Sequence, residues 1–534
     1  MRHTLLSLLS CLVISAQIPA RIAPGYRTIQ ETDLRANLAF LASDALQGRL
    51  SLQPGDDAAA QWVASEFAKA GLKPASDGTF LQPVPLIEYR NDRAQSFISL
   101  SRGGADKQMK FPDAYGTFPK DVDAKGDVVF AGFGITAPEL GYDDYKGIDA
   151  TGKIVLIFDH EPQENDAKSI FNGTGNTRYA TTRVKVLNAQ AHGAIGVLIV
   201  AEPNRKHPSN QERVARIGGS ARGAVPLPTQ ALADDALHIP AAVISDAIGR
   251  ELFPNAAEAQ ANIDRDLAPQ SRILPDTNIT IHLQNLFSHT GTTYNVAGLL
   301  PGSDPQLGSE TLIISAHHDH NGASGTEIFH GADDNGSGTV GVVELAHAFA
   351  ANPQKPKRSI LFVVFAAEER GLLGAFYMAA HPLCPLATTR AMINFDMIGR
   401  NEAESEQTKG LIEVPADTTN RLNLIGGTYS PEYHRVVEEE NKLVGLVLDD
   451  RFDHESALNV FFRSDQFPFV LHDIPAFWWF TGFHPDYHHT TDTYDRINYV
   501  KMAKILRLAY LTAFRIGDAK VTPKFVVNPK PGSV

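Results

Sequence analysis

SAHHDHNGASGTEIFHGADDNGSGTVGVVELAHAF, the segment from Ser315 to Phe349, places histidines and carboxylates between two apolar runs. Before the polar residues, Thr311 to Ala316 is a short apolar run with β-branched residues, which is typical of a buried strand. After them, Gly338 to Ala350 has apolar residues at helical spacing. The segment therefore predicts a strand followed by a helix, with a polar cluster on the connection between them.

The chain around this segment alternates predicted strands with predicted helices. The further strands are Ile279 to Leu283, Tyr294 to Leu300, Ile360 to Ala366 and Ala391 to Asp396, and Gly371 to Ala380 is a further helix. This alternation indicates an α/β sheet that is covered by helices.

The part of the chain before this region forms two more groups of predicted elements. Glu31 to Leu72 has helical spacing with a break at Gly48 to Gly55, and Phe80 to Ser101 alternates like a pair of strands. A second unit begins near Lys125. Its predicted elements are strands in GDVVFAGFG and GKIVLIFDHEP, the helix Thr181 to His192, and the strands Ile195 to Val200 and Ala241 to Ile244. Residues 204–229 predict a surface loop within this unit, and a domain boundary is expected near Pro275.

Composition sets the broad class of the protein. The chain has 534 residues with 43% hydrophobic content, which suggests two to four globular domains. Its 48 basic and 61 acidic residues give a formal net charge of −13, and no long run of Lys or Arg is present. Nucleic acid is therefore not an expected partner. The composition gives no expectation about the oligomeric state.

The first twenty residues resemble a secretory signal. Arg2 and His3 precede an apolar stretch from Leu5 to Ile14, and small residues follow at Ala16 and Ala20. We therefore expect an exported protein, either periplasmic or secreted. No later segment reaches the roughly 20 apolar residues that span a bilayer, so no membrane span is expected. Of the two cysteines only Cys384 lies outside this signal, which excludes a disulfide within the mature chain.

Polar groups recur at the ends of several predicted strands. Glu368 and Glu369 follow one strand, Asp396 ends another, and a histidine-rich stretch from His484 to His489 follows Trp478-Trp479-Phe480. Carboxylates at one edge of an open α/β sheet converge on a single crevice. Such a group needs a cation to limit its mutual repulsion, and mixed His and carboxylate ligands suit zinc. The number of these groups fits two metal ions better than one.

Each polar group alone has a simpler explanation. Asp333 to Gly336, for example, is typical of a turn with a helix cap. Their recurrence at successive strand ends favours a shared site instead. The acids around Asp333 lack the alternating spacing of an EF-hand, and no Gly-x-Ser-x-Gly nucleophile motif is present. A metal-activated water is therefore the expected nucleophile.

The order of these motifs resembles the co-catalytic zinc exopeptidase family. The motifs are His-x-Asp, Gly-Ala-Asp-Asp-Asn-x-Ser-Gly, Ala-Ala-Glu-Glu, Asn-Phe-Asp-Met-Ile-Gly and Asp-Tyr-His, and they cover about Tyr294 to Tyr499. That family includes secreted bacterial aminopeptidases and glutamate carboxypeptidases. Leu41 to Arg49 resembles the amino-terminal opening of the same family, and residues from about 125 to 265 resemble its protease-associated (PA) domain.

The resemblance implies a fold and a division of the chain. The fold is α/β: a mixed-sheet α/β/α sandwich with an inserted, mainly β PA domain. The expected parts are a signal peptide at 1–20, an N-terminal segment of the peptidase domain at 21–120, the PA domain at 121–275, the zinc peptidase domain at 276–520, and an extended tail at 521–534.

The resemblance also implies roles for individual residues. It makes His317 and Asp396 ligands of one Zn²⁺ ion, Glu369 and His488 ligands of a second, and Asp333 the bridge between them. Glu368 is implied as the general base. Further implied roles are Asp319 as the acceptor of the second ring proton of His317, Tyr487 as an oxyanion donor, and Arg463 in the substrate pocket beside Ser464 and Asp465. No ligand role is expected for His318, His320, His330, His484 or His489, and the Asp333–Asp334 peptide is expected to be cis.

The implied activity is a two-zinc aminopeptidase that acts on peptides with a free N-terminus. Three alternatives stay open. One is carboxypeptidase or dipeptidase action within the same family. Another is cyclisation of N-terminal glutamine, which the family's cyclase relatives perform with a single zinc. A third is a non-catalytic binding protein on the same fold, which would be expected to have lost ligands.

Overall fold

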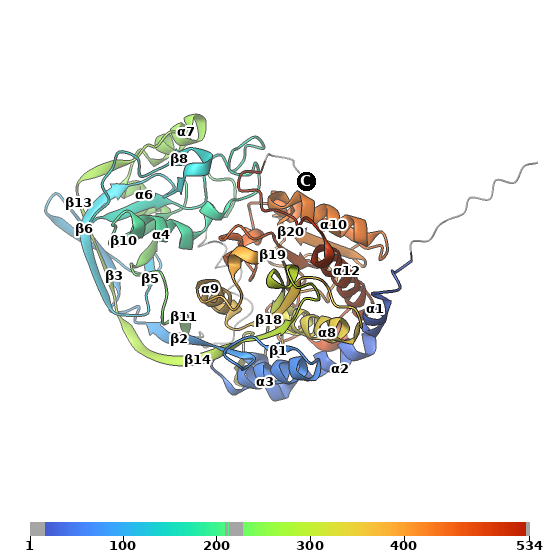
Figure 1. Cartoon of the computed structure of the whole chain (residues 1–534). Helices are drawn as coiled ribbons and strands as arrows, with labels where there is room; N and C mark the ends of the chain where they lie inside the picture. The colour runs from blue at the N-terminus through green and yellow to red at the C-terminus, as the bar shows by residue number, and fades with distance from the viewer. Residues whose placement is uncertain (1–16, 209–211, 213–227, 530–534) are drawn as a thin grey trace, which may run out of the picture.

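The computed structural model describes residues 17–208, 212 and 228–529 (Figure 1). Most of the expected signal peptide, and residues 209–211 and 213–227 of the expected surface loop, lie outside these residues. Within the described part of the chain, no helix combines the length and apolar character needed to cross a membrane. After Asp518 the described residues contain no helix or strand, and Phe525 stacks on Tyr429 with ring centroids 5.4 Å apart.

A ten-stranded mixed sheet forms the larger of two units. Its strand order is β11-β2-β14-β18-β15-β19-β22-β20-β21, with β1 beside β14. The strands are β1 (Lys73–Pro74), β2 (Leu81–Asn91), β11 (Thr229–Leu232), β14 (Asn285–Leu300), β15 (Thr311–His317), β18 (Ser359–Phe365), β19 (Thr389–Phe395), β20 (Arg421–Ile425), β21 (Val447–Asp449) and β22 (Ala476–Phe480). The central neighbours β18, β15, β19 and β22 are parallel, whereas β14 and β20 run antiparallel to their neighbours β18 and β22.

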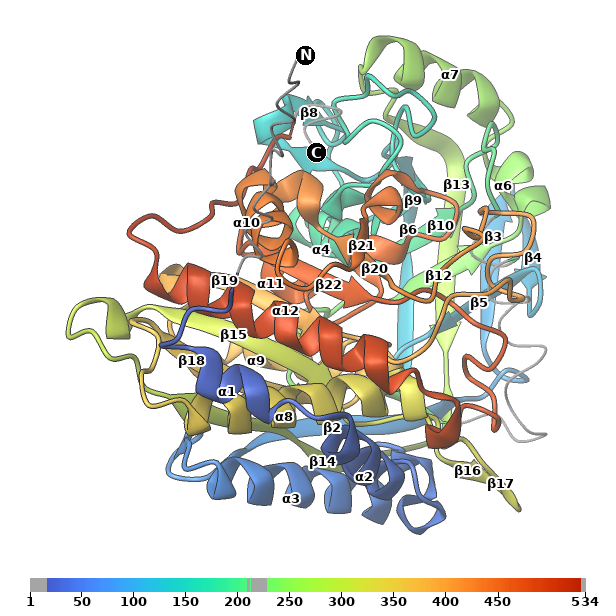
Figure 2. The same cartoon turned by 90° about the vertical axis from the view of Figure 1, so that its right-hand side faces the viewer.

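Helices cover both faces of this sheet. One face packs against α1 (Ala23–Thr28), α2 (Glu31–Leu41), α3 (Pro54–Lys69), α8 (Gly338–Ala351), α10 (Pro431–Asn441) and α12 (Tyr499–Asp518). The other face packs against α9 (Leu373–Ala380) and α11 (Phe467–Val470). Figure 2 shows α8 and α12 lying across the strands on the first face. The predicted mixed-sheet α/β/α sandwich is confirmed.

Burial explains why the central elements form where the sequence predicted them. Every residue of β15 and β18 is buried, because a parallel strand covered on both faces reads as one continuous apolar run. Helix α8 is buried almost all round, between the sheet and α12. Gly341 permits this close packing, since a Cβ atom there would lie 2.9 Å from Leu506 Cδ2.

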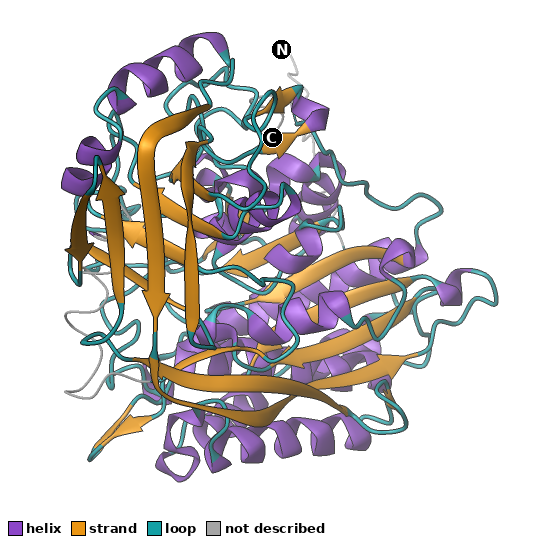
Figure 3. Ribbon diagram, turned by 90° about the vertical axis from the view of Figure 1, so that its left-hand side faces the viewer, coloured by secondary structure: helices purple, strands orange, loops and turns teal. Residues whose placement is uncertain are grey.

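An eight-stranded sheet forms the second unit. Its order is β4 (Ala105–Met109), β3 (Phe97–Arg102), β13 (Arg272–Leu283), β6 (Val122–Phe130), β9 (Ile154–Phe158), β10 (Gly196–Val200), β12 (Ala241–Ile244) and β5 (Ala114–Thr117). The helices α4 (Thr182–Ala191), α6 (Asp246–Leu252) and α7 (Ala256–Asp266) accompany it. Apolar clusters lie on both of its faces. The expected inserted, mainly β domain is confirmed, and Figure 3 shows its strands running in a different direction from those of the larger sheet.

The two sheets share out the chain in a way that suggests other limits for this second unit. The strands between Phe97 and Thr117 belong to the smaller sheet, although residues 21–120 were assigned to the peptidase part. Strand β11, inside the expected PA range, pairs with β2 of the larger sheet instead. Only Gln284 separates β13 from β14, so the chain passes from one sheet to the other there, whereas the domain boundary is expected near Pro275, which lies within β13. We therefore propose that the inserted domain runs from about Phe97 to Leu283, with β11 returning to the larger sheet.

Short elements complete the described structure. The two-residue strands pair as β7 (Thr136–Ala137) with β8 (Tyr142–Asp143) and as β16 (Ala323–Ser324) with β17 (Glu327–Ile328). Single helical turns that matter for the site are η1 (Asp44–Arg49), η5 (Ala332–Ser337), η6 (Glu368–Arg370), η9 (Arg451–His454) and η10 (Val460–Phe462).

Candidate metal centre

Four neighbouring parallel strands end at one edge of the larger sheet, and each end carries candidate ligands. His317 is the last residue of β15, and Asp396 directly follows β19. Glu368 and Glu369 lie in η6 after β18, and His488 lies in the loop after β22. Parallel strands place their carboxyl ends together, so residues far apart in sequence meet here.

The first group of ligands surrounds Nε2 of His317. Oδ1 of Asp334 and Oδ1 of Asp396 both lie 3.6 Å from this nitrogen. All three side chains are buried, and their ligand atoms lie within 4.8 Å of one another. Three convergent N and O atoms of this kind can hold one divalent ion.

The second group surrounds the other carboxylate oxygen of Asp334. Nε2 of His488 lies 3.0 Å from Oδ2 of Asp334 and 3.2 Å from Oε2 of Glu369. Nδ1 of His320 lies 2.6 Å from Oε1 of Glu369 and 3.8 Å from Oδ2 of Asp334. Asp334 therefore faces both groups, one oxygen to each, which is the arrangement of a bridging carboxylate.

The structure puts Asp334 rather than Asp333 between the two groups. Oδ1 of Asp333 instead accepts hydrogen bonds from the Gly399 amide at 2.6 Å and from the Ser337 hydroxyl at 3.1 Å. Its Oδ2 lies 3.2 Å from Nε2 of His484. Adjacent residues of a turn point in different directions, which the sequence alone did not resolve. The cis peptide is likewise one residue later than expected, at Asp334–Asn335.

Buried polar contacts hold the loops that carry these ligands. Oδ2 of Asp492 accepts the amides of Asp333 and Asp334 at 2.9 and 3.1 Å. Arg49, at the end of η1, is fully buried and donates to the carbonyls of Leu41, His318, His330 and Gly331 at 2.7–2.8 Å. Burial lowers the pKa of Arg49 to about 10, so it stays charged at neutral pH. The sequence marked Arg49 only as the end of a motif, without a role.

The buried carboxylates of this centre would be stabilised by added positive charge. Burial, together with the nearby Glu369, raises the pKa of Asp334 to about 8. Burial also raises the pKa of Glu368 well above its ordinary value. Nε2 of His317 and Oδ2 of Asp334 are buried without a hydrogen-bond partner. Buried polar atoms are normally satisfied, so this donor set fits divalent metal ions.

Glu368 lies beside the first group of ligands, but its carboxylate belongs to neither group. Its Oε2 lies 3.7 Å from Nε2 of His317, and 10% of its side chain is exposed. The carboxylate of Asp319 accepts the amides of Glu368 at 2.9 Å and Glu369 at 3.3 Å, which orients both. Nδ1 of His317 lies 3.2 Å from the backbone carbonyl of Asp319 and 3.6 Å from its carboxylate, so the carbonyl is the nearer acceptor of the ring proton.

Tyr487 and Arg463 lie together beside the second group. The Tyr487 ring stacks on His488 with centroids 3.9 Å apart, and its hydroxyl lies 3.4 Å from a guanidinium nitrogen of Arg463. Burial raises the pKa of Tyr487 well above its ordinary value, so the hydroxyl keeps its proton.

The residues after Arg463 reach the first group. The Ser464 hydroxyl donates to Oδ2 of Asp396 at 2.6 Å and accepts from the Asn394 amide at 2.8 Å. Both carboxylate oxygens of Asp465 are buried without a hydrogen-bond partner. The family resemblance implied that this segment lies in the substrate pocket, but it gave no role to Ser464 or Asp465.

The remaining histidines divide into two kinds. His318 pairs with Asp56 at 2.9 Å and His330 with Asp44 at 2.8 Å, so both have carboxylate partners outside the two groups. His320 differs from the expectation, because it joins Asp334 and Glu369 in one group of candidate ligands. Its position three residues after His317, beyond the end of a strand, gave no signal that separated it from its neighbours.

Two family models match the chain. Residues 295–513 match peptidase family M28, and residues 124–252 match the PA domain. These matches confirm the resemblance stated from the motifs.

Individual proteins match shorter parts or match less closely. A probable zinc metalloprotease of Pyrenophora teres f. teres (strain 0-1) is 39% identical over 112 residues, which are 19% of this chain and 24% of that protein. Leucine aminopeptidase 2 of Trichophyton equinum is 26% identical over 249 residues, or 46% of this chain and 42% of that protein. The chain thus spans less than half the length of these curated relatives. The aminopeptidase from Aneurinibacillus sp. strain AM-1 aligns in structure over 95% of this chain and 98% of its own, with a TM-score of 0.49 and 19% identity.

Proposed function

We propose that this chain, which carries a family M28 peptidase domain and an inserted PA domain, is an exported zinc aminopeptidase that removes residues from the N-termini of peptides. The observation that carries the proposal is Asp334, whose two carboxylate oxygens face two buried groups of candidate ligands. The signal-like residues 1–20 support export to the periplasm or beyond. The relative named a leucine aminopeptidase supports the choice of reaction.

In this proposal His317 and Asp396 hold one zinc ion, Glu369 and His488 hold a second, and Asp334 bridges them. Bound zinc would polarise the scissile carbonyl and lower the pKa of a water molecule. Ser464 and Asp319 keep ligands in place, through hydrogen bonds to Asp396 and to the amide of Glu369. His320, 2.6 Å from Oε1 of Glu369, either orients that carboxylate or takes part in ligation.

Glu368 acts as the general base in this scheme. It accepts a proton from the attacking water and returns the proton to the leaving amine, so the same carboxylate serves both halves of the reaction. Its partly exposed side chain lies beside the first group of ligands, within reach of a bound peptide. Because Glu369 is the ligand, its neighbour Glu368 stays available for proton transfer.

Tyr487 and Arg463 complete the site beside the second group of ligands. The Tyr487 hydroxyl, kept protonated by its burial, donates to the carbonyl oxygen as negative charge develops there. Arg463, 3.4 Å from that hydroxyl, fixes its orientation and adds positive charge. The free amino group of the peptide would be held among the carboxylates, which confines cleavage to the terminal residue.

A panel of aminoacyl p-nitroanilides, assayed with and without a chelator, tests this function. We expect release of p-nitroaniline from substrates with a free amino group, loss of activity with the chelator, and recovery on adding zinc. N-acetylated versions of the same substrates are the matched controls. Equal cleavage of blocked and free substrates would overturn the aminopeptidase proposal.

The same panel separates the alternative reactions. A carboxypeptidase would require a free C-terminus, so peptide amides with free N-termini would resist cleavage. A glutaminyl cyclase would act on N-terminal glutamine without breaking a peptide bond. The bridging position of Asp334 favours two metal ions over the single zinc of cyclisation.

A further inference from the structure

A second group of candidate metal ligands lies in the inserted domain, outside the proposed active site. It consists of His160, Glu164, Glu202 and His207, whose ligand atoms all lie within 4.8 Å of one another. At most 6% of any of these four side chains is exposed. Imidazoles and carboxylates buried together either pair with one another or bind a common metal ion.

The four residues lie at the carboxyl ends of two parallel neighbours, β9 and β10. His160 and Glu164 are on the loop after β9, and Glu202 and His207 are on the loop after β10. The register pairs the last residues of these strands, Phe158 and Val200. The inserted domain thus repeats at its own sheet edge the arrangement that converges ligands in the peptidase part.

The contacts converge on Nε2 of His207. Oε2 of Glu164 lies 2.6 Å from this nitrogen, and Oε1 of Glu202 lies 2.5 Å from it. Oε1 of Glu164 lies 2.6 Å from Nδ1 of His160. Neither Nε2 of His207 nor either oxygen of Glu202 makes a hydrogen bond. A buried carboxylate and a buried ring nitrogen therefore point into the group and meet there as ion pairs without hydrogen-bond geometry.

The second ring nitrogen of His207, Nδ1, has a hydrogen-bond partner outside the group. Nδ1 lies 2.9 Å from the carbonyl oxygen of Pro208, and a carbonyl can only accept, so Nδ1 carries a proton. The other nitrogen, Nε2, faces the two carboxylates, and a metal ion bound there would replace a proton on it. A hydrogen bond of this kind from the far nitrogen is common in histidines that bind metals.

The charge of the group is compatible with one bound divalent ion. The rings of His160 and His207 stack with centroids 3.8 Å apart, and two stacked imidazolium cations would repel each other strongly in a buried setting. Metal binding would displace the ring protons, and the two glutamates then leave a charge of −2, which one divalent cation offsets. The buried Lys185 does not supply this charge to the group, since its ammonium donates to the carbonyls of Phe133 and Phe158.

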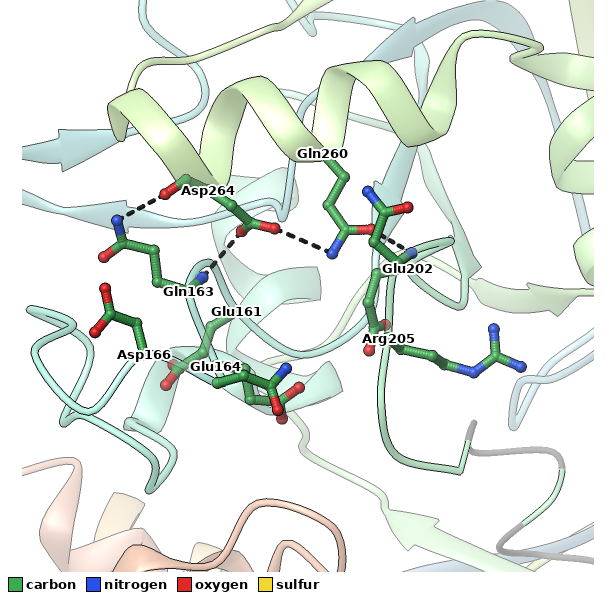
Figure 4. A pocket seen from close by; sticks show the side chains of 10 residues that line it. Glu161, Gln163, Glu164, Asp166, Glu202, Arg205, Gln260 and Asp264 are labelled. Carbon is green, nitrogen blue, oxygen red and sulfur yellow. Dashed lines mark hydrogen bonds between the residues drawn. The ribbon is translucent and has the colours of Figure 1, made fainter.

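An acidic pocket of about 350 Å³ adjoins the group and provides an entry path (Figure 4). Glu164 and Glu202 are among its lining residues, together with Glu161, Asp264 and Arg205. Figure 4 shows Gln260 and Asp264 descending from α7 over the glutamates below. Half of the lining residues carry carboxylates and one carries a positive charge, so the pocket attracts cations and repels anions.

We propose that His160, Glu164, Glu202 and His207 form a separate site for one divalent transition-metal ion. Zinc is the best match, since it accepts mixed imidazole and carboxylate ligands with four-fold coordination. The carboxylate oxygens now lie 2.5–2.6 Å from the ring nitrogens, which is shorter than the distance between two ligand atoms of one metal ion. Binding an ion therefore requires small outward shifts of the carboxylates.

The site joins the two loops to each other and steadies a contact with the peptidase part. The loop that carries His160 continues to Thr174, whose hydroxyl donates to the carbonyl of His454 in η9 at 3.1 Å. Farther along, Arg178 pairs with Asp473 at 2.6 Å. Glu161, next to His160, also fixes the conformation of this loop, because its carboxylate accepts the Thr177 amide at 2.9 Å. The metal ion therefore has a structural role in holding the inserted domain against η9.

Metal analysis of the full-length chain tests the proposal. Wild type and His207→Asn are dialysed against metal-free buffer after loading with zinc, and all first-row metals, calcium and magnesium are counted by mass spectrometry. We expect His207→Asn to hold one transition-metal ion fewer per chain than wild type. The matched control is His238→Asn, which changes an exposed histidine of the same domain and should keep the wild-type count.

Two further measurements make the result decisive. Glu202→Gln, of nearly the same shape, replaces His207→Asn if that variant does not fold, and it should lose the same ion. A His317→Ala, Asp334→Asn chain, which lacks ligands of the proposed active site, should still hold one ion that further substitution of His207 removes. Equal metal counts in folded wild type and in the variant of the inserted domain would overturn the site, whatever the fate of the peptidase zinc ions.

Discussion

At the scale of single residues, the adjacent side chains of Asp333 and Asp334 have different partners and different roles. Asp334 directs its two oxygens to His317 and His488, whereas Asp333 accepts hydrogen bonds that fix the turn after β19. A one-residue difference therefore separates a candidate bridging ligand from a structural carboxylate.

Substitution of each aspartate by asparagine should separate these roles. Asp334→Asn removes the bridging charge, so we expect loss of bound zinc in the peptidase centre and of activity, with the fold retained. Asp333→Asn should instead lower the free energy of unfolding by about 1–3 kcal/mol, since it weakens buried hydrogen bonds, and keep more zinc than Asp334→Asn. Zinc content and denaturant unfolding of both variants measure the difference. The reverse pattern would restore Asp333 as the bridge.

Glu368→Gln tests the proposed base. The amide cannot accept the proton of the attacking water, so turnover should fall by about 10² or more. Zinc content should not change, because Glu368 belongs to neither group of ligands in the structure. Steady-state rates on an aminoacyl p-nitroanilide and metal analysis of the same sample give both quantities. Full activity in this variant would refute the role.

At the scale of elements, buried charges position the strand ends and helices. Arg49 at the end of η1 joins two loops of the centre through backbone carbonyls. Glu344 in α8 is 5% exposed, and burial raises its pKa to about 7. Arg49 is satisfied by its hydrogen bonds, whereas the buried charge of Glu344 destabilises the folded state. Removing the charge of Arg49 should therefore lower the free energy of unfolding, and removing that of Glu344 should raise it.

Arg49→Met should destabilise the protein. It leaves several buried carbonyls without a donor, and the expected loss is about 3 kcal/mol or more in the free energy of unfolding. Arg250→Met, which changes an exposed arginine of α6, is the control and should change stability by less than about 0.5 kcal/mol. Urea unfolding of both variants measures these values; similar curves for the two would contradict the role of Arg49.

Glu344→Gln should stabilise the protein in a pH-dependent manner. The folded pKa of about 7 lies above the ordinary value of 4.5, so the folded state binds more protons between these values and wild-type stability falls as pH rises through that window. The stability gained by the variant should therefore grow from about pH 4.5 to pH 7 and reach up to about 3 kcal/mol. Unfolding at several pH values, with the exposed Glu404→Gln as control, measures it. A pH-independent difference would contradict the buried-charge explanation.

The elements at the centre of the larger sheet were predictable because buried strands and helices appear in the sequence as continuous or regularly spaced apolar residues. β15, β18 and α8 match their predicted ranges to within one residue at each end. Strand β11 was not predicted, since its place beside β2 depends on long-range contacts such as that of Gln230 with Ser51. The directions of Asp333, Asp334 and His320 also depend on loop geometry, which residue spacing does not encode.

At the scale of the whole molecule, two sheets are joined through consecutive strands. β13 ends the smaller sheet and β14 enters the larger one after a single residue, and Figure 1 shows β14 curving from one unit toward the other. Each sheet gathers histidines and carboxylates at the carboxyl ends of its parallel strands. The motifs predicted the centre in the larger sheet, while the cluster in the inserted domain carried no motif and required the structure.

Anomalous diffraction at the zinc absorption edge, from crystals of the zinc-loaded chain, tests the central claim most directly. We expect two peaks at the edge of the larger sheet, one between His317 and Asp396 and one between Glu369 and His488, with Asp334 between the peaks. A single peak there, or none, would contradict the proposed two-zinc centre.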